Sequence, residues 1–211
     1  MSYPTRTRLL TAAIGAAALL SAVGCAADES NRSSDSTSSQ HAAESHSVTS
    51  SAAAAAQRDD FDQADVTFLA GMYPHHAQAV AMAELVPERS QNPRIRELAT
   101  SIEQAQQPEM DQIAALLQSF GQPAPTTAMS AMDGHAGMMS NQQMTDLAAA
   151  SGSTFDTMFL TMMIAHHQGA VEMANAELAE GRNPDTKQLA EQIITAQQSE
   201  IDLMNTLLAG S

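Results

Sequence analysis

The stretch FLTMMIAHHQGAVEMA, residues 159–174, organises the whole chain, because it occurs a second time as FLAGMYPHHAQAVAMA at residues 68–83. A constant offset of 91 residues carries His75 onto His166 and His76 onto His167. This alignment needs no gap from Asp65 to Phe120. A repeat within one chain indicates that both copies meet the same structural demand. We therefore expect two similar helical hairpins, one over residues 65–120 and one over residues 156–211.

The spacing of apolar residues predicts that each copy contains two long helices. Asn92-Pro93 recurs as Asn183-Pro184, and Asn before Pro is typical of a helix start. The pattern predicts helices over about residues 61–85, 93–120, 154–179 and 184–208, with a short helix over 142–150. A long connection over 122–144 joins the two hairpins. This order predicts an all-α fold, a four-helix bundle with a crossover.

The first 24 residues have the pattern of a secretory signal peptide. Arg6 and Arg8 precede an apolar run over residues 9–23, and small residues follow. Ala22-Val23-Gly24-Cys25 resembles a bacterial lipobox, and Cys25 is the only cysteine of the chain. We expect an exported lipoprotein held on the extracytoplasmic face of the cell membrane by a lipid on Cys25. The alternative is an ordinary secreted protein with a chance cysteine.

Residues 25–58 are rich in Ser and Ala and contain almost no large apolar side chain. Such a segment buries too little surface to offset the entropy of ordering, so we interpret it as a disordered tether. Residues 59–211 then form one bundle domain. The formal net charge of −15 argues against nucleic acid as a partner and is compatible with cation capture.

The histidine pairs lie on the apolar stripe of their helices, at about 100° of turn per residue. Glu109 and Glu200 lie likewise on the apolar face of the partner helices, at a level where each can reach a histidine of its own hairpin. A buried polar group without a partner costs roughly 1–3 kcal/mol. The inward histidines and glutamates therefore either satisfy one another as a structural network or bind a metal.

Methionine distinguishes this pattern from bundles that hold di-iron centres through Glu-x-x-His. Three residues before His75 and His166 stand Met72 and Met163, and thioether with imidazole selects copper, Cu(I) in particular. The candidate metal ligands are Met72, His75, His76, Met82, Met163, His166, His167 and Met173. Met82 and Met173 have core packing as their alternative role. A second, looser metal site is predicted in the connection at Met129, Met132, His135, Met138 and Met139, unless this segment is a plain linker.

These residues resemble the bacterial domain of unknown function 305 (DUF305) family, with its Met-x-x-His-His-x-x-Ala-x-x-Met type of motif. The resemblance covers residues 61–211 and includes the Gln-x-x-Glu pairs Gln106/Glu109 and Gln197/Glu200. It implies a ferritin-like fold and copper binding, since characterised members are exported copper-binding proteins linked to copper resistance. Ala165, where the family often has Pro, is a mild departure.

The first hypothesis is a non-enzymatic copper-binding lipoprotein for sequestration, tolerance or transfer of copper to a partner protein. Glu109 and Glu200, with Gln106 and Gln197, would not bind the metal and would instead orient the metal-binding imidazoles. The second hypothesis is a ferritin-like oxidase or peroxidase that uses iron or manganese. The third is a structural lipoprotein whose histidines only satisfy the core.

Overall fold

The computed structural model describes residues 58–127 and 136–210. Within them the chain is all-α, as predicted, and no strand occurs in these two ranges. The helices are α1 Gln63–Ala83, α2 Val86–Arg89, α3 Pro93–Ser119, α4 Asn141–Ala149, α5 Gly152–Glu180 and α6 Pro184–Ala209. The predicted signal peptide, Cys25 and the tether up to residue 57 lie outside the described residues.

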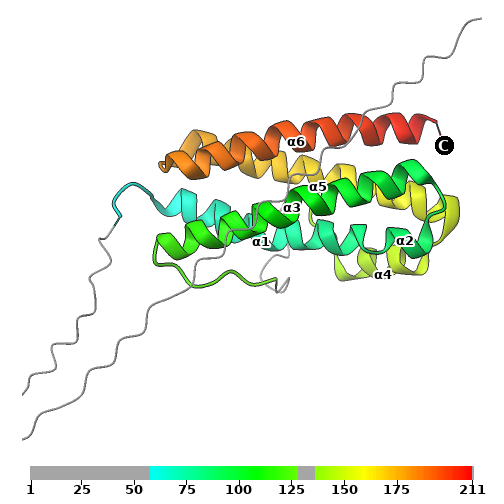
Figure 1. Cartoon of the computed structure of the whole chain (residues 1–211), viewed down its shortest axis with the longest axis horizontal. Helices are drawn as coiled ribbons and strands as arrows, with labels where there is room; N and C mark the ends of the chain where they lie inside the picture. Colours follow the sequence, from blue (N-terminus) through cyan, green and yellow to red (C-terminus); the bar gives the residue numbers. More distant parts are fainter. Residues whose placement is uncertain (1–57, 128–135, 211) are drawn as a thin grey trace, which may run out of the picture. The chain divides into compact units, whose positions relative to one another are not determined.

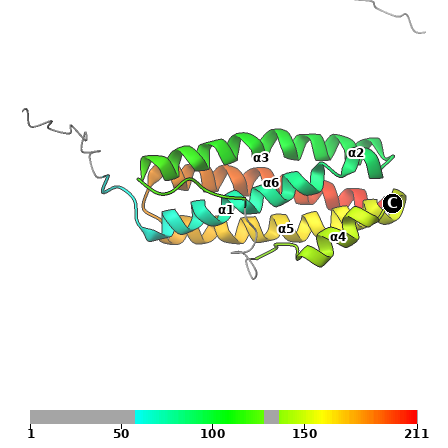
Figure 2. The same ribbon diagram turned by 90° about the horizontal axis from the view of Figure 1, so that it is seen from below.

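The four long helices form a bundle of two antiparallel hairpins (Figures 1 and 2). One hairpin is α1 with α3, and the other is α5 with α6. Helix α1 also packs against α5, and α3 packs against α6, so the hairpins contact each other through both members. After α3 the chain returns to the other end of the bundle, where α4 leads into α5 and packs beside it (Figure 1). This return is the predicted crossover.

The helix starts follow the sequence closely. The Asn92 side chain accepts a hydrogen bond from the Arg94 amide, and Asn183 accepts from Asp185 and Thr186. Each asparagine therefore satisfies amides that the first turn of a helix leaves without partners. Helix α1 begins after Asp62 in a capping box that sequence analysis did not identify.

The observed helix bounds differ from the predicted ones by at most two residues, and a short helix was missed. Helix α1 ends at Ala83 instead of residue 85, and Val86–Arg89 forms α2 with Pro87 in its first turn. Proline suits a first turn because the amide it lacks would have no partner there. Pro74 lies inside α1 and Pro108 inside α3, and both helices continue through them.

Two groups of buried apolar side chains fill the bundle. The first contains Met82 and Met163 with Phe155 and Phe159, and the second contains Met72 with its neighbours from α3, α5 and α6. Along α1 the histidine pair lies between Met72 of the second group and Met82 of the first. The histidines are therefore placed where the two apolar groups meet.

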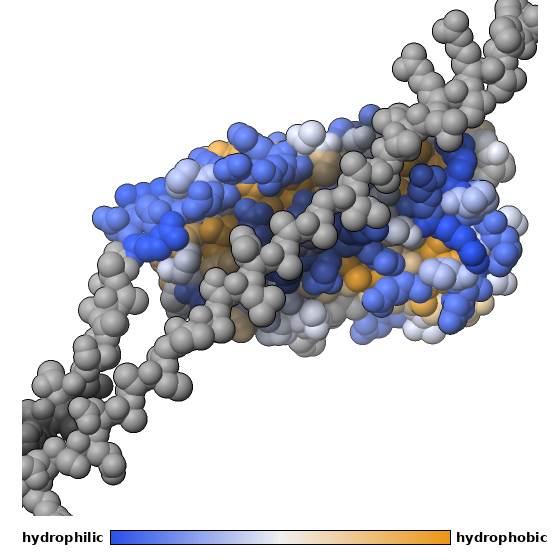
Figure 3. Space-filling view, viewed as in Figure 1, coloured by the Kyte–Doolittle hydropathy of each residue, from blue (hydrophilic) through white to orange (hydrophobic). Residues whose placement is uncertain are grey.

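Hydrophilic residues cover most of the described surface seen in Figure 3, and hydrophobic residues show in the seams between helices. Among the described residues, Leu203 is the large hydrophobic residue that is clearly exposed. No helix in the described part of the chain has the length and apolar character needed to cross a membrane.

Candidate metal centre

All four repeated histidines are completely buried. Helix α1 supplies His75 and His76, and α5 supplies His166 and His167, each with no exposed surface. The rings of His75 and His166 lie against each other, with 3.8 Å between centroids and 42° between planes. The packing of α1 against α5 thus brings one histidine of each repeat into direct contact.

His76 and His167 are held in the same way by the partner helix of their own hairpin. His76 Nε2 lies 2.7 Å from Glu109 Oε2, and His167 Nε2 lies 2.7 Å from Glu200 Oε2. The prediction that each glutamate reaches a histidine of its own hairpin is confirmed. When Nε2–H donates to the carboxylate, the neutral ring carries its lone pair on Nδ1. Nδ1 of both rings is buried and has no hydrogen-bond partner among the described residues.

His166 has the least polar support of the four. Neither ring nitrogen makes a well-formed hydrogen bond with the described residues, although the backbone of His75 lies near the ring. Burial, and then the positive charge that the neighbouring histidines could carry, hold the pKa of His166 well below its ordinary value. The ring is therefore neutral near pH 7, which is the form that can bind a metal.

His75 is anchored differently, through a backbone group of the connection between the hairpins. Its Nε2 lies 3.2 Å from the carbonyl oxygen of Ala136. No feature of the sequence pattern had indicated a role for Ala136. Its neighbour Gly137 packs against the backbone of α5, and Gln78 binds Met139. The polar Gln78 on the apolar side of α1 was the sequence signal for this contact.

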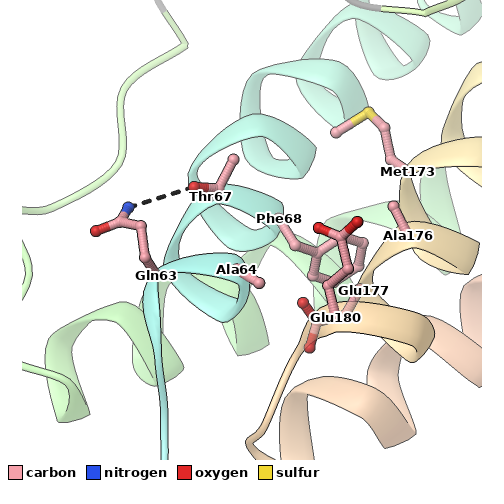
Figure 4. Close-up of a pocket in the computed structure, with 8 residues that line it drawn as sticks. All are labelled: Gln63, Ala64, Thr67, Phe68, Met173, Ala176, Glu177 and Glu180. Carbon is pink, nitrogen blue, oxygen red and sulfur yellow. Dashed lines mark hydrogen bonds between the residues drawn. The ribbon is translucent and has the colours of Figure 1, made fainter.

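The methionine candidates are distributed unequally. Met72 and Met163 are completely buried one helical turn before His75 and His166. Met82 is completely buried in the first apolar group. Met173 is partly buried and lines a pocket between the first turns of α1 and the last turns of α5, whose lining contains no histidine (Figure 4). The structure does not bring Met173 together with the histidines.

The remaining candidates divide between buried positions and undescribed ones. The amides of Gln106 and Gln197 are buried and make no hydrogen bond with any described residue, so the structure does not link them to an imidazole. Met129, Met132 and His135 lie outside the described residues, whereas Met138 is partly buried and Met139 buried. Within residues 58–127 and 136–210, no three side chains of His, Cys, Asp or Glu are gathered as a metal site.

A pair of carboxyl groups, Asp65 and Glu177, was missed by sequence analysis. Asp65 is fully buried and accepts hydrogen bonds from the amides of Asp62, Arg182 and Asn183. Burial, followed by the hydrogen bond and the charge of Asp65, raises the pKa of Glu177 to about 8. Both oxygens of Asp65 accept from backbone amides, so a hydrogen bond between the two carboxyls needs its proton on Glu177.

The comparisons with known proteins agree with this architecture. A family model described as "Domain of unknown function (DUF305)" matches residues 65–208. A DUF305 fragment from Deinococcus radiodurans is 34% identical with a TM-score of 0.66, covering 71% of this chain and 98% of that one. CopM in a Cu(II)-bound form is 30% identical with a TM-score of 0.61, covering 69% of this chain and 96% of that one.

Two further proteins are similar to this chain. A DUF305 protein from Streptomyces coelicolor, assigned as secreted, is 32% identical with a TM-score of 0.64, covering 70% of this chain and 93% of that one. Protein L153 from Acanthamoeba polyphaga mimivirus is 40% identical over 53 residues, which is 25% of this chain and 35% of that relative. The chain thus matches about a third of that relative's length. Since the family model spans more than half of the chain, the protein belongs to the DUF305 family.

Proposed function

We propose that this protein binds copper, Cu(I) in particular, between α1 and α5 at the four buried histidines. The observation that carries the proposal is His166, a completely buried imidazole in ring contact with His75 and with no well-formed hydrogen bond in the described structure. A buried polar ring without partners is costly, and a bound metal ion would supply the missing interaction.

The chemistry of the donor atoms fits copper. His166 is held neutral by its surroundings, and His76 and His167 have buried Nδ1 atoms without partners in the described residues. Neutral imidazole with thioether sulfur favours Cu(I) over magnesium, calcium or manganese. We assign Met72 and Met163 as the thioether donors, because both are buried one turn from a histidine on the same helix.

Glu109 and Glu200 would orient the metal-binding rings. A histidine that binds a metal through one nitrogen usually donates its other N–H to a carboxylate or a carbonyl. The two 2.7 Å contacts at His76 and His167 have this form. Met82, Met173 and the methionines of the connection are assigned no role at this site.

The relatives support the assignment to copper. CopM has been solved in Cu(I)-bound, Cu(II)-bound and silver-bound forms, and it is 29–30% identical to this chain in these comparisons. The proposal also includes a ferritin-like bundle that is built from two repeated hairpins. It also includes export by the signal peptide and attachment to the membrane through a lipid on Cys25. At that location the protein would sequester copper or pass it to a partner, without catalysing a reaction.

A Cu(I) competition titration against a chromophoric chelator, without oxygen, tests the proposal. All proteins are the full chain with Cys25→Ser, so that the thiol cannot bind copper. Replacing His75, His76, His166 and His167 together by Ala should weaken binding by roughly 100-fold or more, since losing ligands exceeds the loss of their hydrogen-bond partners.

The matched control replaces His41 and His46, which lie in the predicted tether, and should bind like the parent protein. Circular dichroism checks that the quadruple variant keeps its helices, and His166→Phe gives a second variant with the buried space filled. Equal affinity of the parent and both core variants would contradict the proposal. Tight binding of iron or manganese, with weak binding of copper, would favour the oxidase alternative.

A further inference from the structure

Residues Ala136–Met139, which we term the strap, are held against α1 by the side chain of Gln78, in addition to the contact between Ala136 and His75. Gln78 Nε2 donates to the carbonyl oxygen of Met139 at 2.8 Å, and Gln78 Oε1 accepts from the Met139 amide at 2.7 Å. The amide side chain thus satisfies both backbone groups of one strap residue. Gln78 is almost completely buried, so both bonds lie away from water and leaving either unmade is costly.

On the other side, the strap lies against the backbone of α5 at a place where only glycine fits. A Cβ atom on Gly169 would overlap the carbonyl group of Ala136. A Cβ atom on Gly137 would collide with the carbonyl oxygen of Ala165, and Gly137 has a φ of +78° that side chains rarely adopt. Two glycines therefore permit the close approach of the strap to the helix.

The positions that hold the strap are the same position of the repeat. Gln78 and Gly169 are separated by the 91-residue offset that relates the two copies. In the first copy this position fastens the strap, and in the second copy it makes room for it. The two helices are similar around the histidines and differ where the strap is seated.

The position of the strap against α1 and α5 decides which group His75 contacts. The carbonyl oxygen of Ala136, the residue that Gly169 accommodates, lies 3.2 Å from His75 Nε2. A carbonyl only accepts, so the contact requires the proton on Nε2 and gives Nδ1 the lone pair of the neutral ring. Glu109 and Glu200 place the same requirement on His76 and His167.

We propose that the strap is the positioning element of His75: it fixes the ring as the Nε2–H tautomer and thereby sets the metal affinity of the site. The part that concerns affinity rests on the proposed function. Three histidines then present Nδ1 as the metal-binding atom, two through glutamates of their own hairpins and one through a backbone carbonyl from the connection. The connection between the repeats is thus a part of the metal site.

The test uses Gly169→Ala in the full chain with Cys25→Ser. Alanine favours a helix more than glycine does, so a loss of function cannot be attributed to a weaker helix. The matched control is Gly210→Ala, where a Cβ atom would meet neighbours only at ordinary distances of 3.6 Å or more. Histidine-ring ¹⁵N NMR of the metal-free protein reports the tautomers, and a His75→Phe variant identifies the His75 signals.

In Gly169→Ala we expect the His75 signals to leave the Nε2–H pattern, while those of His76 and His167 stay unchanged. Cu(I) affinity should fall about 10- to 100-fold, the usual effect of losing a hydrogen-bond partner of a metal-binding histidine. Gln78→Leu, which removes both bonds to Met139 and keeps a side chain of similar size, should act in the same direction. Gly210→Ala should change neither readout.

An unchanged His75 tautomer in both strap variants would overturn the proposal, even if copper affinity fell, because the strap would then act only on general stability. Unchanged affinity in both variants would also overturn it. A parent protein that binds no copper would contradict the proposed function, and the NMR result would still decide whether the strap holds His75.

Discussion

The two hairpins agree at one histidine and differ at the other. His76 and His167 each contact a glutamate of the partner helix at 2.7 Å. By contrast, His75 contacts the strap, whereas His166 makes no well-formed hydrogen bond with the described residues. Contacts within one hairpin are duplicated with the sequence. The connection between the hairpins occurs once, so it can support only one histidine of the pair.

A second difference between the copies lies at the end of the bundle where α1 begins and α5 ends. Asp65 of the first copy binds the amides of Arg182 and Asn183 in the turn between α5 and α6. At the positions 91 residues away, Glu177 stands where the first copy has Val86, and Asp156 stands where it has Asp65. The acid pair therefore links the two copies at one end only. Because the pKa of Glu177 is raised in this pair, the pair makes the stability of the protein depend on pH.

The largest expected effect concerns this acid pair. The pKa of Glu177 is raised from 4.5 to about 8, so between these values the folded protein keeps a proton that the unfolded chain has released. Stability contributed by Glu177 is therefore lost as pH rises through this window, by up to about 4 kcal/mol. Glu177→Gln, whose amide donates to Asp65 at any pH, should remove this loss.

Urea unfolding of the metal-free protein at pH 5 and pH 8 measures the effect. Parent and variant must be compared at each pH, because the lowered pKa of His166 acts in the opposite direction below its ordinary value of 6.5. Asp62 and Lys187 also influence Glu177 and stay the same in both proteins. An identical pH dependence of the parent and Glu177→Gln would show that the pair carries no proton.

The next effect tests how equivalent the glutamates are. Glu109→Leu and Glu200→Leu each leave a buried imidazole nitrogen without its acceptor, and each should lower the free energy of unfolding by about 1–3 kcal/mol. The matched controls are Glu109→Gln and Glu200→Gln, which keep an acceptor oxygen. Similar losses in the two copies would support the equivalence of the two histidine–glutamate pairs, and a loss confined to one copy would contradict it. Chemical unfolding of the metal-free variants is the measurement.

The smallest effect concerns Gln106 and Gln197, which occupy equivalent positions in α3 and α6. Both amides are buried without a hydrogen-bond partner in the described residues. Replacement of either by Met, which has a similar shape, should raise the free energy of unfolding by about 1 kcal/mol, because an unsatisfied amide is removed. Thermal unfolding measures this gain. Destabilisation of both variants would indicate that the amides have partners, and a parallel loss of copper affinity would connect them with the metal.

Much of the fold and part of the site could be predicted from the sequence. The repeat, the Asn-Pro helix starts and the apolar spacing gave the long helices to within two residues. That Glu109 reaches a histidine of its own hairpin followed from counting outward from the turn of an antiparallel hairpin, and the structure identifies this histidine as His76. These features depend on neighbours in sequence or on one hairpin, and helix geometry relates them directly.

Other features require the distances between elements. The sequence does not place Ala136 beside His75 or Glu177 beside Asp65, since each pair joins segments from different parts of the chain. Met173 shows the same limit, because it matches Met82 in the repeat but lines a surface pocket that holds Glu177.

The sequence by itself determined the duplicated hairpin, its helices and the histidine–glutamate pair within each copy. The reason is that helical periodicity and capping act locally and repeat whenever the residues repeat. Only the tertiary structure decided that the copies are unequal. The strap lies where α1, α5 and the connection meet, and the acid pair lies between the start of α1 and the end of α5. The single connection reaches one histidine of the pair whose rings are in contact.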